Sequence, residues 1–334
     1  MLVRSMLFVV DTHTEGEPTR IVVGGLPGVP GETALEMREY IRRNLDWVRT
    51  TVIHEPRGHA GSFGAIVLPP ARPDVDYTLV FMDSSGYLDM CGHGTMGVTT
   101  ALIELGMVDA REPQTTVVYE TPAGVVSARA EVVDGRVKSV TVRDVPSFYL
   151  GNLEVDVRGI GPVPVDIAFG GNFFAIVDGE NLGVSVEPGN IKRLIELGLE
   201  VRDAANRAFP TEHPINPRIR GIKLTLISDK PKLVGAHARN VTIFADGAFD
   251  RSPCGTGTAA KMATLHAKGE LRLGEEFVHE SIIGTRFVGR LVEKTRVAEY
   301  EAVIPEISGR AYITSISHLV VDPDDPLRHG FIVR

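Results

Sequence analysis

The stretch LDMCGHGTMGVTTALIELG, residues 88–106, has a counterpart in DRSPCGTGTAAKMATLHAKGEL, residues 250–271. Each places a Cys directly before Gly-x-Gly-Thr, and the chain of 334 residues has no other cysteine. After each Cys an apolar-rich segment runs for roughly four turns and meets a glycine, Gly106 or Gly269, where a helix can end. The sequence therefore predicts, twice, a Cys-Gly-x-Gly-Thr turn that leads into a helix.

Strand-like runs surround both turns, and helix-like patterns are few. LFVV, RIVVGG, GAIVLP and YTLVFM come before the first turn, and a meander over residues 115–145 follows it. Apolar residues recur at helical spacing in residues 32–45 and 187–208, one segment ahead of each Cys turn. The predicted class is therefore α+β and rich in strands. One plan of strands, outer helix, Cys turn and second helix is expected twice.

This repeat predicts two pseudo-symmetric domains. The first is expected over residues 1–132 and contains Cys91, and the second is expected over residues 137–320 and contains Cys254. A C-terminal strand at about residues 322–334 is expected to cross back to the first domain. No low-complexity linker separates the two halves.

The composition argues against several classes of protein. A net charge of −8 does not suit a nucleic-acid binder, which usually has a basic patch. No apolar run approaches the roughly 18–20 residues that a membrane span needs. The start, MLVRSMLFVVDTH, has too short an apolar part and no small-residue cleavage site, so it predicts a first strand and not a signal peptide. A cytoplasmic protein with reduced thiols is expected, with neither nucleic acid nor membrane as a partner.

Two non-catalytic interpretations of the Cys turns compete with a catalytic one. A nucleotide site would use G-x-G-x-x-G, which residues 92–97 match and residues 255–260 match with a final Ala, but the flanking hairpins lack the βαβ context. A disulfide or a pair of buried thiols leaves the glycines around each Cys unexplained. A zinc site lacks the four-ligand spacing, so no metal is expected.

The catalytic interpretation explains both turns together. The dipole and the N–H groups at a helix start favour a thiolate, so the pKa of each Cys is expected to fall. The same N–H groups can bind a carboxylate. Two such turns, facing each other across a cleft, would place a sulfur on each side of the α-carbon of a small carboxylate ligand. Inversion of a carbon acid needs two such bases, one to remove a proton from one face and one to return a proton to the other.

At these residues the sequence resembles the proline racemase family, which shares its fold with diaminopimelate epimerase. The resemblance covers nearly the whole chain. The matching motifs are MCGHG (90–94), DRSPCGTG (250–257), DTHTEGEPTR (11–20), RGHAGSFGA (57–65), FGGNFFA (169–175) and ESIIGTRFVGR (280–290). It implies two diaminopimelate epimerase-like domains, each a curled, mostly antiparallel sheet around a central helix, with the active site in the cleft between them. It also implies an isomerase that works without a cofactor, often as a homodimer.

The resemblance implies a role for several residues. Cys91 and Cys254 would be the acid and base, and they would exchange these roles after each turnover. His93 and Asp250 would contact the substrate nitrogen. The backbone N–H groups that would hold the substrate carboxylate belong to Gly92, His93, Gly255, Thr256 and Gly257. Two alternatives remain open, because Asp250 can be an ordinary turn residue and His93 a capping or packing residue.

The residues expected to line the pocket for the substrate ring indicate which small molecule is the preferred substrate. Phe63, Leu88 and Phe244 would give it an apolar lining, which suits the unsubstituted ring of proline and leaves a ring hydroxyl without a partner. Each of the three can also be plain core. Because Cys254 is present, the dehydratase branch of the family is not favoured. The expected activity is proline racemase, and the alternatives are 4-hydroxyproline 2-epimerase or a non-catalytic carboxylate-binding module. Diaminopimelate epimerase activity fits less well, because its long polar substrate needs polar recognition groups that this apolar lining does not offer.

Overall fold

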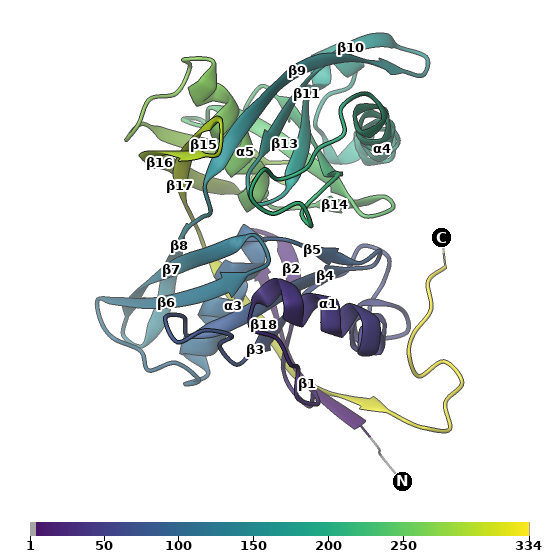
Figure 1. Ribbon diagram of the computed structural model, residues 1–334, viewed down its shortest axis with the longest axis vertical. Coiled ribbons are helices and arrows are strands. Elements are labelled where there is room, and N and C mark those ends of the chain that lie inside the picture. The colour runs from purple at the N-terminus through teal and green to yellow at the C-terminus, as the bar shows by residue number, and fades with distance from the viewer. Residues whose placement is uncertain (1–4, 334) are drawn as a thin grey trace. The chain divides into compact units, whose positions relative to one another are not determined.

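The computed structural model describes residues 5–333 and contains two compact units (Figure 1). One unit comprises the chain up to Thr141 and from Arg310 onward, and the other comprises Val142–Gly309. The predicted limit of the second domain, residue 320, is therefore wrong. Strand β18 (Ala311–Val321) pairs with β1 (Ser5–Thr14) and so belongs to the first unit.

The strand that returns to the first unit thus lies earlier than predicted. Residues 322–333 form turns and one isolated bridge between Phe331 and Glu55, and not the strand expected there. A run of Asp and Pro residues from Asp322 to Pro326 explains this difference, because both residue types are depleted in strands and Pro cannot donate to a ladder. Residues 1–4 of the predicted first strand and Arg334 lie outside the described residues.

The first unit is a curled sheet with helices on both faces. The pairings run β18–β1–β2–β3–β4–β6–β7, and β5 lies beside β4. The remaining strand bounds are β2 Glu17–Gly24, β3 Phe63–Leu68, β4 Tyr77–Asp83, β5 Tyr87–Leu88, β6 Gln114–Thr121 and β7 Gly124–Val133. Strand β8 (Arg136–Arg143) begins in the first unit and ends in the second. Helix α3 (Gly92–Glu104) packs on β1, β2, β3, β7 and β18. Helices α1 (Ala34–Asn44) and α2 (Asp46–Ile53) pack instead on β3, β4 and β6.

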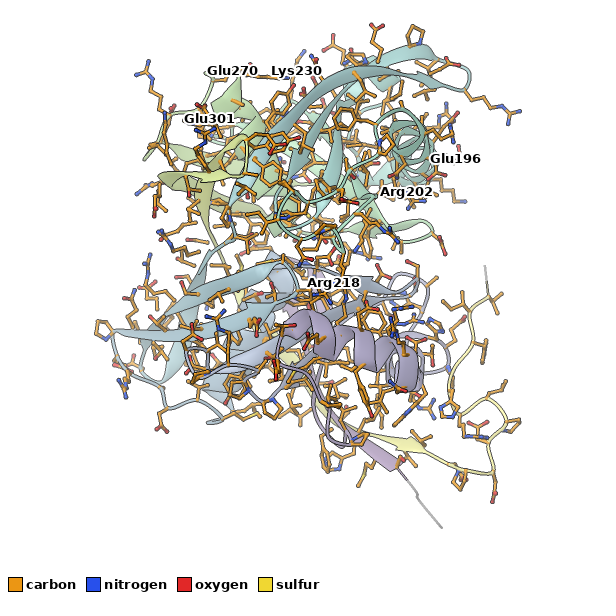
Figure 2. All side chains as sticks on the ribbon, viewed as in Figure 1. Glu196, Arg202, Arg218, Lys230, Glu270 and Glu301 are labelled. Carbon is orange, nitrogen blue, oxygen red and sulfur yellow. The ribbon has the colours of Figure 1, made fainter. Side chains whose placement is uncertain are left out.

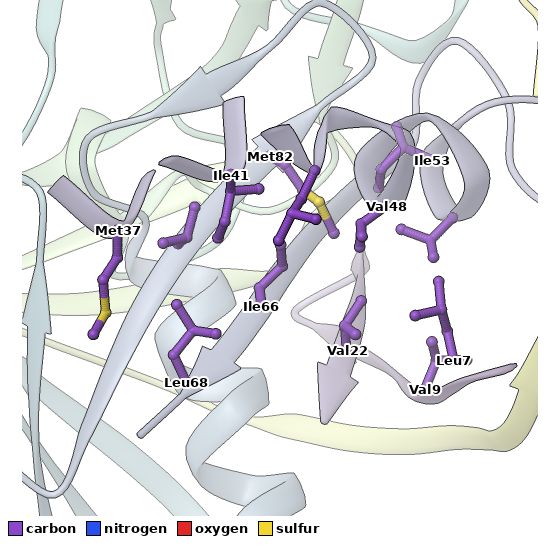
Figure 3. Close-up of a cluster of buried hydrophobic side chains, with 13 residues drawn as sticks. Leu7, Val9, Val22, Met37, Ile41, Val48, Ile53, Ile66, Leu68 and Met82 are labelled. Atoms are coloured by element: carbon purple, nitrogen blue, oxygen red, sulfur yellow. The ribbon is translucent and has the colours of Figure 1, made fainter. Parts of the chain in front are cut away.

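A hydrophobic cluster holds α1 and α2 on the sheet (Figure 3). Ile66 and Met82 are strand residues of this cluster, whereas their neighbours Ala65 and Phe81 point to the opposite face, because side chains alternate along a strand. Both faces of β3 and β4 are therefore covered. This double burial explains why GAIVLP and YTLVFM are continuous apolar runs and not alternating ones.

In the second unit the strand pairings close into a ring. They run β9–β10–β11–β12–β13–β15–β16–β17 and return to β9. The strand bounds are β9 Ser147–Val157, β10 Gly161–Phe169, β11 Phe173–Asp178, β12 Ile222–Asp229, β13 Ala238–Phe244, β14 Ala248–Asp250, β15 Glu276–Ser281, β16 Arg286–Val297 and β17 Tyr300–Gly309. Helix α5 (Gly255–Ala267) packs on β9, β10, β11, β16 and β17, and α4 (Ile191–Ala208) packs mainly on β12, β13 and β9. Two short 3-10 helices, Gly179–Leu182 and Pro188–Asn190, precede α4.

The two units repeat one topology. In each, a parallel pair (β2–β3 and β11–β12) is followed by an antiparallel partner (β4 and β13), a short strand (β5 and β14) and the helix that begins after the Cys. The next strand (β6 and β15) then pairs in parallel with β4 or β13. The predicted duplication and the α+β class are confirmed, and each unit is a curled sheet packed on a helix.

All four predicted helices are present, and one further α-helix was missed among the described residues. The segments at 32–45 and 187–208 contain α1 and α4, and α3 and α5 begin directly after Cys91 and Cys254. Gly106 and Gly269 have φ of 70° and 79° and follow α3 and α5 as predicted helix ends. The missed helix is α2, whose β-branched run Thr50–Ile53 has a strand-like composition.

The charged side chains of Glu196, Lys230, Glu270 and Glu301 lie on the outer surface (Figure 2). On α4, Glu196 pairs with Arg193 and is 66% exposed, whereas Leu194 and Leu197 are fully buried. This is the amphipathic pattern that the sequence predicts for residues 187–208. Within residues 5–333, no helix is both long and apolar enough to cross a membrane.

Candidate active site

The Cys91 turn brings a thiol, an imidazole and a helix start together. Cys91 is the N-cap of α3, and its Sγ accepts from the Gly94 N–H at 3.3 Å. The Nδ1 atom of His93 lies 3.2 Å from the same sulfur. Cys91 and His93 are each 5% exposed. The sulfur thus has both the helix N-terminus and a ring that can exchange a proton within contact distance.

Two of the predicted apolar residues form a wall beside this turn. The Phe63 ring lies 4.6 Å from that of His93 between centroids, and Phe81 stacks on Phe63 at 6.2 Å. Leu88 is the ladder partner of Phe81 and therefore points to the same face of the sheet. A Cβ at Gly94 would lie only 3.1 Å from both Phe rings and would press on them, so glycine allows the helix to approach the wall without moving the rings. Sequence reasoning found Phe63 and Leu88 but missed Phe81.

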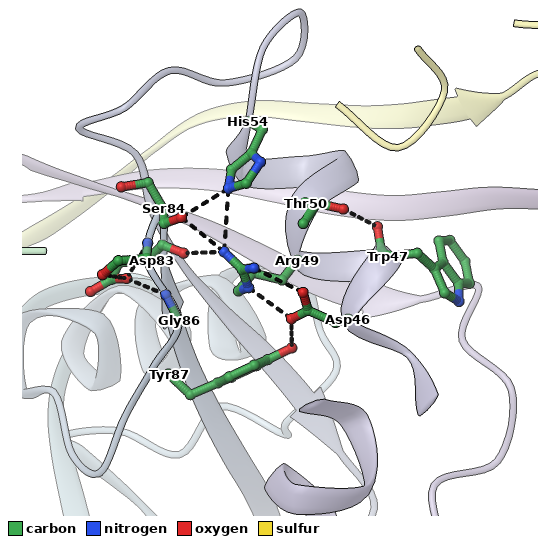
Figure 4. Close-up of polar contacts among 10 residues, drawn as sticks. Asp46, Trp47, Arg49, Thr50, His54, Asp83, Ser84, Gly86 and Tyr87 are labelled. Atoms are coloured by element: carbon green, nitrogen blue, oxygen red, sulfur yellow. Dashed lines mark hydrogen bonds and ion pairs between the residues drawn. The ribbon is translucent and has the colours of Figure 1, made fainter. Parts of the chain in front are cut away.

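An ion-pair network holds the chain that leads into Cys91 (Figure 4). Arg49 on α2 donates twice to the Asp46 carboxylate at 2.8 Å and also to the carbonyls of Asp83 and Ser84 at 3.1 and 3.0 Å. The Tyr87 hydroxyl donates to the same Asp46 at 2.8 Å. The turn between β4 and β5 is therefore tied to α2, as is Tyr87, four residues before the thiol.

Two further contacts hold the turn from either side. Arg38 on α1 forms a buried ion pair with Asp89, two residues before Cys91. The Thr14 hydroxyl, at the end of β1, donates to the carbonyl of His93 at 2.9 Å. Neither Arg38 nor Thr14 lies within a Cys motif, so the sequence around each Cys gives no signal for them.

The Cys254 turn has the same sulfur geometry on a different backbone. Cys254 is the N-cap of α5, and its Sγ accepts from the Gly257 N–H at 3.3 Å. The Thr256 hydroxyl lies 3.8 Å from the sulfur. Cys254 has φ of 62°, in the left-handed region, whereas Cys91 has φ of −150°. A non-glycine residue with this φ stores strain that its surroundings must offset.

Asp250 lies close enough to Cys254 to affect its titration. Burial raises the pKa of the Cys254 thiol and the Asp250 carboxylate raises it further, although the Gly257 N–H and the hydroxyls of Thr242 and Thr256 act in the opposite direction. The predicted lowering of the pKa is therefore wrong for Cys254, because burial outweighs the effect of the helix start. Asp250 also accepts from the Ser252 N–H at 2.8 Å, which is the turn contact expected of an Asp there.

The third apolar residue, Phe244, belongs to the second unit. It is 5% exposed and ends β13, two residues after Thr242, which is the ladder partner of Asp250. Residues two apart on a strand share a face, so Phe244 lies on the face of β13 that is turned to the Cys254 turn.

The predicted site residues therefore form two clusters, one in each unit. The first contains Cys91, Gly92, His93, Phe63 and Leu88, and the second contains Cys254, Asp250, Gly255, Thr256, Gly257 and Phe244. Of the N–H groups expected to bind a carboxylate, that of Gly257 donates to the Cys254 sulfur in this structure. Across residues 5–333, no three His, Cys, Asp or Glu side chains are grouped so that they could hold a metal ion.

The comparisons with known proteins agree with this geometry. The family model described as proline racemase matches residues 9–332. The chain is 51% identical to a proline racemase of Clostridioides difficile over 326 residues, 97% of each chain. It is 46% identical to a 4-hydroxyproline 2-epimerase of Streptosporangium roseum over 334 residues, 100% of each chain. A crystal structure of a hydroxyproline epimerase from Agrobacterium vitis with bound trans-4-hydroxy-L-proline superposes with a TM-score of 0.94 at 36% identity, covering 100% of this chain and 97% of that one.

Proposed function

Because the chain belongs to the proline racemase family, and so to the isomerases, we propose that it interconverts L- and D-proline without a cofactor, with Cys91 and Cys254 as the two proton-transfer groups. The observation that carries this proposal is the equivalence of the two sulfurs. Each Sγ accepts an N–H at 3.3 Å from the third residue of its own helix, at matching places in a duplicated fold.

In the proposed reaction one Cys begins as thiolate and the other as thiol. The thiolate removes the α-proton from one face, the bond electrons remain on the α-carbon, and the thiol returns a proton to the opposite face. The protonation states of the two sulfurs are then reversed, so the next turnover runs in the opposite direction. This chemistry requires both turns to reach one substrate molecule. The N–H groups of Gly92, His93, Gly255 and Thr256 would hold its carboxylate and stabilise the charge that develops beside it.

A positively charged substrate nitrogen would offset the negative charge of Asp250 beside Cys254. Asp250 raises the pKa of the Cys254 thiol, and a cationic ring nitrogen bound beside Asp250 would offset that carboxylate. Substrate binding would therefore favour the Cys254 thiolate at the moment when it is needed. His93, whose ring contacts the Cys91 sulfur, would act on the same nitrogen from the first turn.

In the proposed site, the residues lining the substrate ring would decide between proline and hydroxyproline. Phe63, Leu88 and Phe244 are apolar and buried, and they offer no partner to a ring hydroxyl. This lining supports proline as the preferred substrate, with 4-hydroxyproline epimerisation as a second activity of the same site. The second activity has its own support, because two relatives named 4-hydroxyproline 2-epimerase match 100% and 99% of the chain at 46% and 42% identity.

The test compares two substrates in D2O with no added cofactor. L-Proline and trans-4-hydroxy-L-proline are incubated separately, and optical rotation and α-deuterium content are followed together. The proposal predicts loss of rotation with deuterium uptake for proline, and a kcat/KM for hydroxyproline lower by about 5- to 100-fold, which corresponds to one unpaired buried hydroxyl. A higher kcat/KM for hydroxyproline would make the protein an epimerase. No exchange with either substrate would leave a carboxylate-binding module.

A homodimer and a cytoplasmic location remain predictions. Light scattering would test whether the protein is a homodimer.

A further inference from the structure

A buried polar cluster surrounds the peptide bond just before Cys254. The Pro253 carbonyl accepts from the Asn240 side chain at 2.9 Å and from the Thr258 hydroxyl at 3.2 Å. On the other side of the same peptide unit, the Cys254 N–H donates to the Ser252 hydroxyl at 3.1 Å. Both polar groups of this peptide are thus held by side chains, which fixes its plane. The Cys254 carbonyl accepts from the Thr258 N–H at 2.8 Å, so the φ of Cys254 is held from both sides.

His279 connects two members of this cluster. Its Nε2 lies 2.9 Å from the Asn240 amide nitrogen, and its Nδ1 lies 2.9 Å from the Thr258 hydroxyl. Burial, with a smaller contribution from Lys261, lowers the pKa of His279 to about 3, so the ring is neutral at neutral pH. Since the amide nitrogen can only donate, Nε2 accepts, and Nδ1 donates to Thr258. The Thr258 hydroxyl is then left with its own proton to donate to Pro253.

The pairing of β13 with β15 places the cluster in the interior of the second unit, next to the Cys254 turn. Asn240 lies on β13 and pairs with Ser281 of β15, and β15 also contains His279. Asn240 and His279 are each fully buried, and so is Thr258 on the first turn of α5. The cluster is therefore an internal support for the turn and has no solvent in contact with it.

The equivalent threonine makes a different contact in the first turn. There, Thr95 occupies the position equivalent to Thr258, and its hydroxyl donates to the carbonyl of Cys91 at 2.7 Å, one turn back along the helix. Cys91 has an extended φ of −150° and needs no special support. The same sulfur geometry is thus built on an extended Cys91 and on a strained Cys254 whose preceding peptide is held by side chains.

We propose that Thr258, Asn240 and His279 are positioning residues that hold Cys254 in its left-handed conformation, with its sulfur aligned for proton transfer. This inference rests on the proposed function for the role of the thiol, and on the hydrogen bonds above for the conformation. None of the three residues contacts the reacting atoms, and each acts through the Pro253–Cys254 peptide.

The test replaces the Thr258 hydroxyl and compares it with a matched control. Thr258→Val removes the bonds to Pro253 and His279 at nearly constant size. Thr264→Val is the control, because Thr264 is fully buried on the same helix and its hydroxyl donates to the Ala260 carbonyl at 2.9 Å, away from the turn. Proline racemisation is measured as kcat and KM, and iodoacetamide labelling of each Cys is followed by peptide mass spectrometry.

Thr258→Val is expected to lower kcat by about 10- to 100-fold with KM changed less than about twofold, the effect of a misplaced reacting group. Labelling of Cys254 should become faster while labelling of Cys91 is unchanged, Thr258→Ser should restore both, and Thr264→Val should behave as the parent. Equal losses in Thr258→Val and Thr264→Val, or faster labelling of both cysteines, would overturn the inference. If the parent does not racemise proline, the proposed function fails, and the labelling comparison still decides the positioning role.

Discussion

At Gly257 the absence of a side chain allows the first turn of α5 to reach the sulfur of Cys254. A Cβ there would lie 3.0 Å from both the Cys254 Sγ and the Leu226 Cδ1, so one of them would have to move. Gly257→Ala is therefore expected to lower the kcat for proline by about 10-fold or more, because the reacting sulfur is displaced.

The control for this variant is Gly189→Ala. No atom lies within 4 Å of a Cβ built at Gly189, and its φ is not in the left-handed region. This variant should keep the parent kcat. Equal activity in the two variants would show that contact between the Gly257 N–H and the sulfur is not needed.

Single residues differ in how far the sequence predicts them. The matching glycine turns predict that Cys91 and Cys254 lie at helix starts, and the structure places both there. Asn240 and His279 are not predictable, because only the parallel register of β13 and β15 brings them behind the Cys254 turn. The pKa of Cys254 is likewise set by burial, which no local motif specifies.

Among the elements, α1 holds the approach to Cys91 through the Arg38–Asp89 ion pair. The two side chains are 8% and 1% exposed, so removal of the cation leaves a carboxylate in a poorly solvated place. Arg38→Met is expected to lower the free energy of unfolding by about 3 kcal/mol or more. Urea unfolding measures this change, and the kcat for proline should fall as well.

Arg42 on the same helix provides the comparison. Its pair with Glu39 is solvent-exposed, with the Arg42 side chain 52% exposed, so Arg42→Met should cost less than about 1 kcal/mol and leave kcat unchanged. If the two variants have the same stability, the buried pair does not support the approach to Cys91.

Element types are more predictable than their ends and partners. Apolar periodicity predicts α1 and α4, and the glycines 15 residues after each Cys predict where α3 and α5 end. Helix α2 is not predicted, because it starts only two residues after α1 ends and its β-branched run suits a strand equally well. The sequence also cannot show that β18 pairs with β1, since this pairing joins residues about 300 positions apart.

The stability of the whole molecule is expected to depend on pH through Asp144. This residue lies just after the chain passes from the first unit to the second. Burial raises its pKa to about 7, although the Val145 N–H acts in the opposite direction. Below about pH 4 the carboxyl is protonated in both the folded and the unfolded chain. As pH rises from about 4 to 7, the unfolded chain releases this proton while the folded protein keeps it, so about 4 kcal/mol of stability is lost in that range.

Asp144→Asn should remove this loss, because the amide does not titrate. Thermal unfolding of the parent and of the variant is compared between pH 4 and 8, so that the titration of all other groups cancels in the difference. The variant should gain stability relative to the parent as pH rises toward 7, and the difference should then level off. Parallel curves for the two proteins would mean that Asp144 titrates normally in the folded state.

The duplication is the property of the whole molecule that the sequence predicts best. Two Cys turns 163 residues apart are enough to predict two copies of one plan, and the strand pairings repeat it step by step. The boundaries are less predictable because the chain returns to the first unit at Arg310, inside a continuous strand-rich segment without a linker signal.

The most direct test of the two-thiol reaction is racemisation of L-proline by the parent, by Cys91→Ser and by Cys254→Ser, with circular dichroism as a control for folding. A serine hydroxyl does not ionise near neutral pH and cannot replace either acid–base group. Both folded variants are expected to lose racemisation by about 100-fold or more, the contribution of one general acid or base. Racemisation near the parent rate in either folded variant would contradict the account, because one of the two thiols would then be dispensable.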